Sequence, residues 1–318
     1  MNKHLPVVMN IDHIKKGSKL VAEALNPSFG YFYTIRKSLA NSRTKYQKIE
    51  LIDTDEFGKV LLLDDITQVA ENVDHEYHEP MVHPAMCSHP RPESVLVIGG
   101  GDGGIIREVL KYPTVKRVEQ AELDEGVIQF SRKYLAGIHG GCFEDPRVNI
   151  NIVDGRVYTE QHPGEFDVII MDMTDPFGPS RMLYTREFFK IIKKALKNSS
   201  GIFVMHSESP VARPAAYACI QKTLSSVFKN VNPFLLYVQM YAVLWSITLS
   251  SETINPAALK ESAIDKKLDR FDIKNLQVYS GKTHLSMQAV FPYINQITKK
   301  QGRIITDKKP DFPDDFLS

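Results

Sequence analysis

The most conspicuous chemical feature of the sequence is a pair of aspartates at the end of an apolar run. Segment 167–178, DVIIMDMTDPFG, passes from four apolar residues into Asp172 and Asp175, which Pro176 and Gly178 follow. Apolar runs bounded by Pro and Gly are typical of buried strands. No lysine or arginine stands beside the two acids in this segment. The pair therefore either faces water in a loop or binds a cation.

A glycine-rich loop earlier in the chain has the GxGxxG spacing of nucleotide sites. It lies in VLVIGGGDGG, residues 95–104, after a strand-like run and before a helix-like one. The glycines at this spacing are Gly99, Gly101 and Gly104. Such glycines let the backbone approach a ligand, and the first helical turn offers unpaired N–H groups. Glu122 lies 20 residues after Asp102, where an acid binds two ribose hydroxyls; a solvated strand-end acid is the alternative.

Asp102, inside the loop, separates the ligands that such a site can bind. An aspartate here repels a pyrophosphate and the carboxylate of ordinary S-adenosylmethionine, whereas it attracts a ligand that ends in a bare ammonium. At a separation of about 4 Å this attraction amounts to ~4 kcal/mol at an effective dielectric of about 20, before desolvation is subtracted. A simple turn residue is the other interpretation of Asp102. Asp154–Gly155, after the third strand, likewise either reaches an adenine amine or forms a turn.

The secondary-structure elements that must position these residues are predicted from two sequence patterns. Residues 46–71 hold three short apolar–polar alternations, which predict a small antiparallel β unit. Later in the chain, strand-like runs alternate with helix-like runs, which indicates a mostly parallel sheet covered by helices. The apolar window 234–249 predicts two adjacent buried strands at an antiparallel edge. Residues 75–89 look helical, although Pro80 and Pro84 argue against a regular helix.

These patterns predict an α/β fold: a Rossmann-like, mostly parallel sheet of the class I methyltransferase type with a small N-terminal antiparallel β domain. Residues 1–41 have weak periodicity and many basic residues, so we expect a poorly specified N-terminal extension, with a targeting segment as the alternative. The small β domain is expected over residues 42–75 and the catalytic domain over 76–318.

Composition argues against several classes of function. Of the 318 residues 43% are hydrophobic, and the formal net charge is +1, which disfavours nucleic acid and anionic membranes as partners. The three cysteines are far apart and no signal peptide is evident, so we expect a soluble, cytoplasmic protein. The histidines clustered in segment 75–89 match no zinc-ligand spacing, so we expect no metal site.

Six segments in the right order resemble motifs of the spermidine synthase (polyamine aminopropyltransferase) family. They are YQKIELIDTDEFGKVLLLD, YHEPMVHPA, VLVIGGGDGGIIREVLKY, AELDEGVIQFSRKYL, DMTDPFGP and SESP. The resemblance runs from about Tyr46 to the C-terminus and is strongest from Tyr77 to Pro210. It implies transfer of an aminopropyl group from decarboxylated S-adenosylmethionine, as co-substrate, to a primary amine, with putrescine the first expectation and 5′-methylthioadenosine released. It also implies no permanently bound cofactor and a homodimer or tetramer.

The resemblance assigns roles to residues at matching positions. Asp172 is implied as the catalytic acid–base residue, because an alkyl amine with a pKa near ~10 must lose a proton before it attacks carbon. His78 and Asp102 are expected to hold the aminopropyl side, with Asp102 on its ammonium. The residues expected to line the amine pocket are Tyr77, Asp175 and Tyr241. Those implied in binding the nucleotide are Gln47, Gly101, Glu122, Asp154, Gly155 and Pro179.

The sequence departs from the family pattern at four places, all on the amine side. QMYAVLWS replaces the usual TYPSG segment but keeps Tyr241, and VARP, residues 211–214, stands where an aromatic or large apolar residue is usual. His206 replaces a common glutamine, and Met173 replaces a small hydroxyl residue. We therefore expect a conventional aminopropyl donor, and the acceptor stays open among putrescine, cadaverine, agmatine, spermidine and larger amines.

Other functions stay open beside this one. An amine N-methyltransferase of the same fold would use ordinary S-adenosylmethionine, against which the charges of Asp102 and Asp172 argue. A non-catalytic homologue that binds polyamine or nucleotide is suggested by the altered acceptor segments, whereas the retained Asp172 argues against it. A dehydrogenase fits less well, because Asp102 would stand beside the pyrophosphate.

Overall fold

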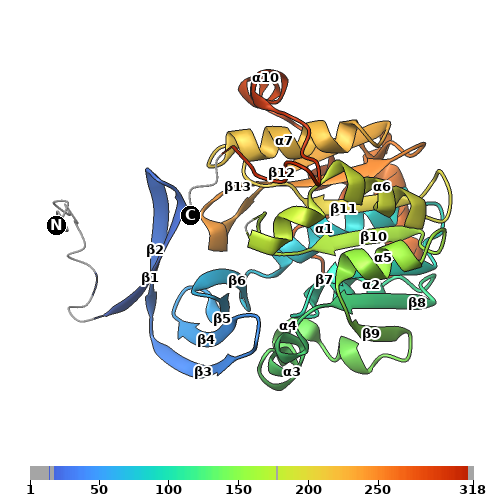
Figure 1. Cartoon of the computed structure of the whole chain (residues 1–318). Helices are drawn as coiled ribbons and strands as arrows, with labels where there is room; N and C mark the ends of the chain where they lie inside the picture. Colours follow the sequence, from blue (N-terminus) through green and yellow to red (C-terminus); the bar gives the residue numbers. More distant parts are fainter. Residues whose placement is uncertain (1–13, 15–17, 177, 314–318) are drawn as a thin grey trace.

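Two antiparallel units precede the main sheet (Figure 1). The computed structural model describes residue 14 and residues 18–176 and 178–313. The first unit is a hairpin of β1 (Lys19–Asn26) and β2 (Phe29–Ile35). The second is a four-stranded sheet with the order of β3 (Lys37–Arg43), β4 (Lys48–Thr54), β5 (Gly58–Leu63) and β6 (Ile66–Ala70). This sheet confirms the small antiparallel β region that the alternating segments predict.

The hairpin corrects the expectation of a poorly specified extension over residues 1–41. Strands occupy most of residues 19–41, and residues 1–13 and 15–17 lie outside the described part. The alternation of apolar and polar residues in β1 and β2 is weak. Only Val21 and Leu25 of β1 are buried, whereas Phe29 and Phe32 of β2 are exposed. Apolar residues on both faces hide the period of two by which strands are recognised. The division of the chain at residues 41 and 75 stays a prediction.

The main sheet has seven strands in the order β12-β13-β11-β10-β7-β8-β9. The five parallel strands are β7 (Ser94–Gly99), β8 (Arg117–Glu122), β9 (Val148–Ile152), β10 (Val168–Asp172) and β11 (Ile202–His206). The antiparallel edge consists of β12 (Asn230–Val238) and β13 (Val243–Ser251). This arrangement confirms the predicted Rossmann-like sheet and its antiparallel edge.

Helices cover both faces of this sheet, so its strands are apolar throughout (Figure 1). Val95 and Val97 of β7 face one core and Leu96 and Ile98 face the other. The first core contains α1 (His75–Ser88), α2 (Gly104–Leu110), α8 (Glu261–Arg270) and α9 (Gly281–Met287). The second contains α5 (Gly155–Gln161), α6 (Arg186–Ala195) and α7 (Pro214–Ser225), with α10 (Pro292–Gln301) packed on α7. Helices α3 (Glu125–Tyr134) and α4 (Ala136–His139) pack on the four-stranded sheet instead.

Helix α1 runs unbroken through Pro80 and Pro84. A proline inside a helix costs roughly 3 kcal/mol because it removes one hydrogen bond and clashes with the preceding turn. The helix is buried from Tyr77 to Cys87 and packs on α2 and against the main sheet. Burial on nearly every side outweighs the local cost, which sequence periodicity alone does not reveal.

Short 3-10 turns complete the fold: η1 (Cys142–Glu144), η2 (Gly178–Leu183), η3 (Gln239–Tyr241) and η4 (Pro256–Ala258). Among the described residues, no helix combines the length and apolar character needed to cross a membrane.

Candidate active site

A cavity of about 470 Å³ lies at the carboxyl ends of β7, β8 and β10, with residues of the four-stranded sheet as its opposite wall. Ligands of open α/β sheets bind at this edge. The predicted site residues that line the cavity are Gln47, Tyr77, His78, Gly101, Asp102, Glu122, Asp154, Asp172, Asp175 and Tyr241. Gly155 is not a lining residue and begins α5 next to Asp154. The Pro179 side chain lies outside the described part.

The glycine loop is held tightly between two strands. Gly99 has φ +81°, and a Cβ there would lie 2.2 Å from the carbonyl oxygen of Asp172, so only glycine fits. The backbone N–H of Gly100 donates to that carbonyl at 3.0 Å. From β8, the buried Gln120 donates its Nε2 hydrogens to the carbonyl oxygens of Gly99 and Gly100, both at 2.9 Å. The loop is therefore fixed relative to Asp172, and sequence analysis missed Gln120.

Glu122 and Gln47 are linked at one end of the cavity by Asp124, which the sequence did not single out as a site residue. Asp124 caps α3 and accepts hydrogen bonds from Gln47 Nε2 at 3.0 Å and Thr44 Oγ1 at 2.7 Å. Its own backbone N–H donates to Glu122 Oε1 at 2.8 Å. Burial raises the pKa of Glu122 to about 7. Asp124 thus ties the small β sheet to the main sheet at the predicted ribose site.

Asp154 fits both interpretations that its sequence left open. Its side chain caps α5 by accepting hydrogen bonds from the backbone N–H groups of Arg156 at 2.7 Å and Val157 at 3.2 Å. It also lines the cavity. A contact with an adenine amine stays a prediction.

Charged groups gather at the centre of the cavity. Ligating atoms of His78, Asp102 and Asp172 all lie within 4.8 Å of one another. His78 Nε2 is 3.5 Å from Asp102 Oδ1, and its Nδ1 is 2.9 Å from Asp74 Oδ2, which also accepts a hydrogen bond from Arg107 at 2.8 Å. Burial opposes charge on His78, but Asp102 and Asp74 outweigh it and raise the pKa of His78 to about 10. An imidazolium therefore adjoins Asp102 at neutral pH, which the sequence did not predict.

Asp102 stays ionised in this environment. Its Oδ1 accepts the backbone N–H of Gly104 at 2.6 Å. Burial pushes the pKa of Asp102 upward, but His78 and this hydrogen bond outweigh burial, so the pKa is lowered. Among Asp74, Arg107, His78, Asp102 and Asp172, three acids face two cations. One negative charge is therefore left over at the end of β10.

Asp172 is poised as a base. Tyr77 Oη donates a hydrogen bond to Asp172 Oδ1 at 2.8 Å. Burial, followed by the charge of Asp102, raises the pKa of Asp172 to about 6. The carboxylate is therefore mostly ionised at neutral pH and is a stronger base than an ordinary aspartate.

Aromatic rings extend the cavity from Asp172 towards the predicted amine pocket. The rings of Tyr77 and Tyr241 are 6.2 Å apart at 78°, and those of Tyr241 and Trp245 are 5.1 Å apart at 49°. Tyr241 Oη donates to the backbone carbonyl of Gln68 at 2.9 Å. His206 lies beside Trp245 with centroids 5.8 Å apart, and burial lowers the pKa of His206. These rings offer an uncharged wall for an alkyl chain.

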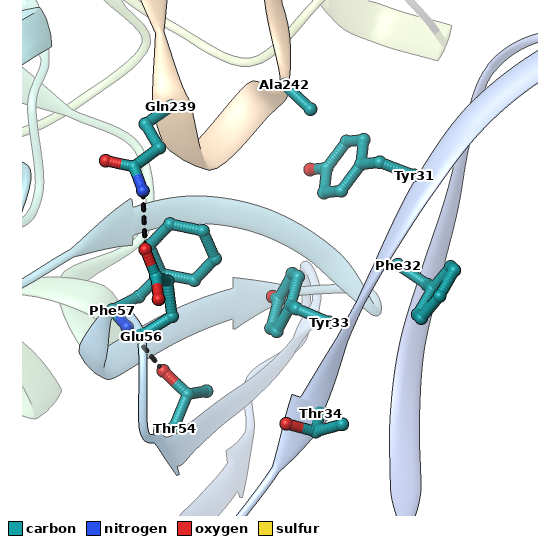
Figure 2. Close-up of a pocket in the computed structure, with 9 residues that line it drawn as sticks. All are labelled: Tyr31, Phe32, Tyr33, Thr34, Thr54, Glu56, Phe57, Gln239 and Ala242. Atoms are coloured by element: carbon teal, nitrogen blue, oxygen red, sulfur yellow. Dashed lines mark hydrogen bonds between the residues drawn. The ribbon is translucent and has the colours of Figure 1, made fainter. Parts of the chain in front are cut away.

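The segment that replaces TYPSG separates this cavity from a second one of about 280 Å³. Tyr241 faces the main cavity, whereas Gln239 and Ala242 line the second, together with Tyr31 and Tyr33 of β2. Figure 2 shows the aromatic wall of this smaller pocket and the hydrogen bond from Gln239 to Glu56, 2.7 Å long. Ala242 has φ +52°, so the chain turns sharply at this point.

Asp175 is not free of cations, contrary to what its sequence neighbours suggest. Arg213 Nη1 donates to Asp175 Oδ2 at 2.5 Å and to both carboxylate oxygens of Glu208 at 3.2 Å. Arg213 belongs to the VARP departure, 38 residues from Asp175. Sequence analysis noted the departure but assigned the arginine no role. Glu23 of β1 also lines the cavity. The sequence did not point to Glu23, because it did not predict strand β1.

Comparison with known proteins agrees with this geometry. The spermine/spermidine synthase domain matches residues 74–261, and the spermidine synthase tetramerisation domain matches residues 21–71. The chain belongs to the spermidine synthase family. This membership confirms the predicted family, its fold class and its transferase function. The roles of individual site residues stay predictions.

Relatives and solved structures of the spermidine synthase family cover most of the chain. A polyamine aminopropyltransferase of Nitrosomonas europaea is 37% identical over 90% of this chain and 87% of the relative. That of Bacillus subtilis is 34% identical over 87% and 98%. A crystal structure of a spermidine synthase in complex with the transition-state analogue AdoDATO has a TM-score of 0.83 at 32% identity, over 88% of this chain and 95% of the other. The spermidine synthase of Thermotoga maritima has a TM-score of 0.81.

Proposed function

We propose that this chain transfers the aminopropyl group of decarboxylated S-adenosylmethionine to a primary amine and releases 5′-methylthioadenosine. The observation that carries the proposal is the half-buried Asp172 at the end of β10, whose pKa is raised, which accepts a hydrogen bond from Tyr77 and which lies beside Asp102 of the glycine loop. The related spermidine synthase whose structure contains AdoDATO supports the choice of donor.

The chemistry needs a base but no acid. The lone pair of the acceptor nitrogen attacks the carbon bound to the sulfonium, the new C–N bond forms and the C–S bond breaks. The bonding electrons pass to sulfur, which leaves as a neutral thioether, so the leaving group takes no proton. The nitrogen loses its proton to Asp172, whose raised pKa suits it to accept one. Fixing both amines in one cavity supplies the proximity that the displacement requires.

The excess negative charge favours a donor without a carboxylate. The aminopropyl group ends in an ammonium, which Asp102 and Asp172 attract. The carboxylate of ordinary S-adenosylmethionine would meet the same two acids, and His78 offers only partial compensation because Asp74 and Asp102 already flank it. We therefore propose decarboxylated S-adenosylmethionine as the co-substrate.

Turnover of the purified chain tests the proposal. The chain is incubated with decarboxylated S-adenosylmethionine and each amine of a panel, and methylthioadenosine release and the aminopropylated product are both measured. We expect equal amounts of the two products with at least one diamine. Methylation of an amine from ordinary S-adenosylmethionine, with no aminopropyl transfer, would contradict the proposal and support the methyltransferase alternative.

We also propose that the chain assembles into a homotetramer. The tetramerisation domain that matches residues 21–71 includes the β1–β2 hairpin. On this hairpin Phe29 and Phe32 are 47% and 49% exposed, and a two-stranded hairpin is only marginally stable alone. Light scattering after size-exclusion chromatography tests this: a mass of four chains is expected, and a monomer or a dimer would contradict it. A cytoplasmic location stays a prediction, which the buried free thiols of Cys87 and Cys142 support.

A further inference from the structure

The C-terminal segment, residues 303–312, packs against the start of α6, next to a wall of the cavity. It lies beyond residue 261, where the matched family domain ends. Ile305 and Phe312 of this segment are buried, and the Ile305 carbonyl accepts a hydrogen bond from the backbone N–H of Arg186 at 2.8 Å. None of residues 303–312, all of which the structure describes, lines the cavity. Any influence of this segment on a ligand must therefore pass through another residue.

Arg156 connects the C-terminal segment to the cavity. It lines the cavity two positions after Asp154, and its Nη1 donates to the backbone carbonyl of Met182, another lining residue, at 2.9 Å. The same guanidinium forms a bidentate ion pair with Asp307: Nη1 is 3.0 Å from Oδ1, and Nη2 is 2.6 Å from Oδ2. Two parallel bonds of this kind fix the plane of a guanidinium as well as its position.

Asp307 is itself held by the start of α6. Its Oδ1 accepts a hydrogen bond from Thr185 Oγ1 at 2.6 Å, and its backbone N–H donates to Glu187 Oε2 at 3.0 Å. Thr185 caps α6 and follows Leu183, the last residue of η2, by two positions. The carboxylate of Asp307 therefore joins α5, through Arg156, to the junction between η2 and α6.

Asp311, a second aspartate of the same segment, forms an ion pair of a different kind. Its Oδ1 accepts a hydrogen bond from Arg181 Nη1 at 2.6 Å. The Asp311 side chain is 63% exposed, whereas that of Asp307 is 32% exposed. Arg181 does not line the cavity, and exposed ion pairs contribute little to stability. Asp311 is therefore a matched control for Asp307.

We propose that Asp307 is a positioning residue for nucleotide binding: it fixes the guanidinium of Arg156, and with it the Met182 backbone, so that this wall of the cavity is preformed when the nucleotide arrives. A preformed wall lowers the cost of ordering side chains on binding. Arg156 follows Asp154, the residue predicted to meet adenine, so the effect concerns the nucleotide and not the amine. The inference rests on the proposed aminopropyl transfer for the identity of the nucleotide.

The test measures the Kd of methylthioadenosine by calorimetry on the full-length chain and on two matched variants. We expect Asp307→Ala to raise this Kd about tenfold, the equivalent of one charge-assisted hydrogen bond. Asp311→Ala should leave it within about twofold of the wild-type value. In steady-state kinetics the KM for decarboxylated S-adenosylmethionine should rise with the Kd, whereas the KM for the amine should change little. An unchanged Kd in Asp307→Ala, or an equal loss in both variants, would overturn the proposal.

A double-mutant cycle separates positioning through Arg156 from a general loss of stability. Arg156→Gln removes the cation through which Asp307 acts, so the further change Asp307→Ala should weaken nucleotide binding no more. Additive losses in the double variant would overturn the proposal. Asp307→Asn keeps the shape of the side chain and replaces Asp307→Ala if that variant does not fold; its Kd should rise by less, and an unchanged Kd would again contradict the role of Asp307.

The same measurements distinguish this inference from the proposed function. A wild-type chain that binds methylthioadenosine but transfers no aminopropyl group would count against the proposed function and leave the comparison of Asp307 with Asp311 intact. A wild-type chain that turns over normally, with the same nucleotide Kd in Asp307→Ala, would count against Asp307 alone.

Discussion

The nucleotide end and the acceptor end of the cavity are built in different ways. At the nucleotide end, Gly101, Asp102, Glu122 and Asp154 lie at or just after the carboxyl ends of β7, β8 and β9, so one sheet edge brings them together. At the acceptor end, the walls come from the hairpin, from β6, from the loop after β10 and from η3. The residues of a site on one sheet edge occur at regular motif spacings in the sequence. A site assembled from distant loops has no such spacing, and a single residue such as Arg213 can change its charge.

The charge arrangement of the two ends differs as well. The nucleotide end keeps an excess of negative charge around Asp172, because three acids face the two cations His78 and Arg107. The acceptor end contains an arginine that neutralises the acid nearest to Asp172 in sequence. This difference supports the prediction that the chain uses a conventional aminopropyl donor and that its acceptor recognition departs from the family pattern.

Loss of the base should have the largest effect. We expect Asp172→Asn to lower kcat by about 10³-fold, the usual contribution of a general base. The control is Asp175→Asn, whose carboxylate already has a cation partner and whose kcat should change far less. Single-turnover rates of methylthioadenosine release provide the measurement. An equal loss of kcat in the two variants would contradict the assignment of Asp172, and not Asp175, as the general base.

Loss of the loop support should come next. Gln120→Leu removes the buried side-chain donor of the carbonyl oxygens of Gly99 and Gly100, of which Gly100 keeps only the bond from the backbone N–H of Gly103. We expect the free energy of unfolding to fall by about 1–3 kcal/mol and the KM for the donor to rise, with a smaller change in the KM for the amine. Chemical denaturation and steady-state kinetics measure both. An equal rise of the two KM values would show that the loop does not act on the donor end alone.

The pH profile offers a finer comparison. Because burial raises the pKa of Asp172 to about 6, kcat/KM for the donor should rise with pH through about pH 6 and then level off as the base ionises. Tyr77 stabilises the ionised form through its hydrogen bond, so Tyr77→Phe should move this limb to higher pH. A limb that stays in place or moves to lower pH would contradict the assignment of Asp172 as the titrating base.

The smallest effect is expected at Tyr241. Tyr241→Phe removes one hydrogen bond to the Gln68 carbonyl but keeps the ring in the aromatic wall. The loss of a single hydrogen bond is worth about 1 kcal/mol, so the KM for the amine should rise a few-fold while the KM for the donor stays unchanged. Tyr241→Ala removes the ring too and should have a clearly larger effect on the amine. Identical behaviour of the two variants would argue against the ring as a contact of the alkyl chain.

Features that depend on local sequence could be predicted, whereas features that depend on contacts between distant residues could not. The strands that end at Asp172 and Glu122, and the glycine loop between sheet and helix, could be predicted because alternation, turn residues and motif spacing are local. The hairpin was missed because its apolar residues lie on both faces. The positive charge on His78 and the partner of Asp175 depend on Asp74 and Arg213, which only folding brings to them. A sequence shows charges but not their pairing.

Binding of two nucleotides tests the central claim most directly, namely that fixed carboxylates match this cavity to a donor without an acid group. Calorimetry should compare decarboxylated and ordinary S-adenosylmethionine on the wild-type chain and on Asp102→Asn. We predict tighter binding of the decarboxylated nucleotide by the wild-type chain, and a loss of about tenfold or more of this preference in the variant. Equal or tighter binding of the carboxylated nucleotide by the wild-type chain would contradict the account, since the imidazolium of His78 would then dominate the site.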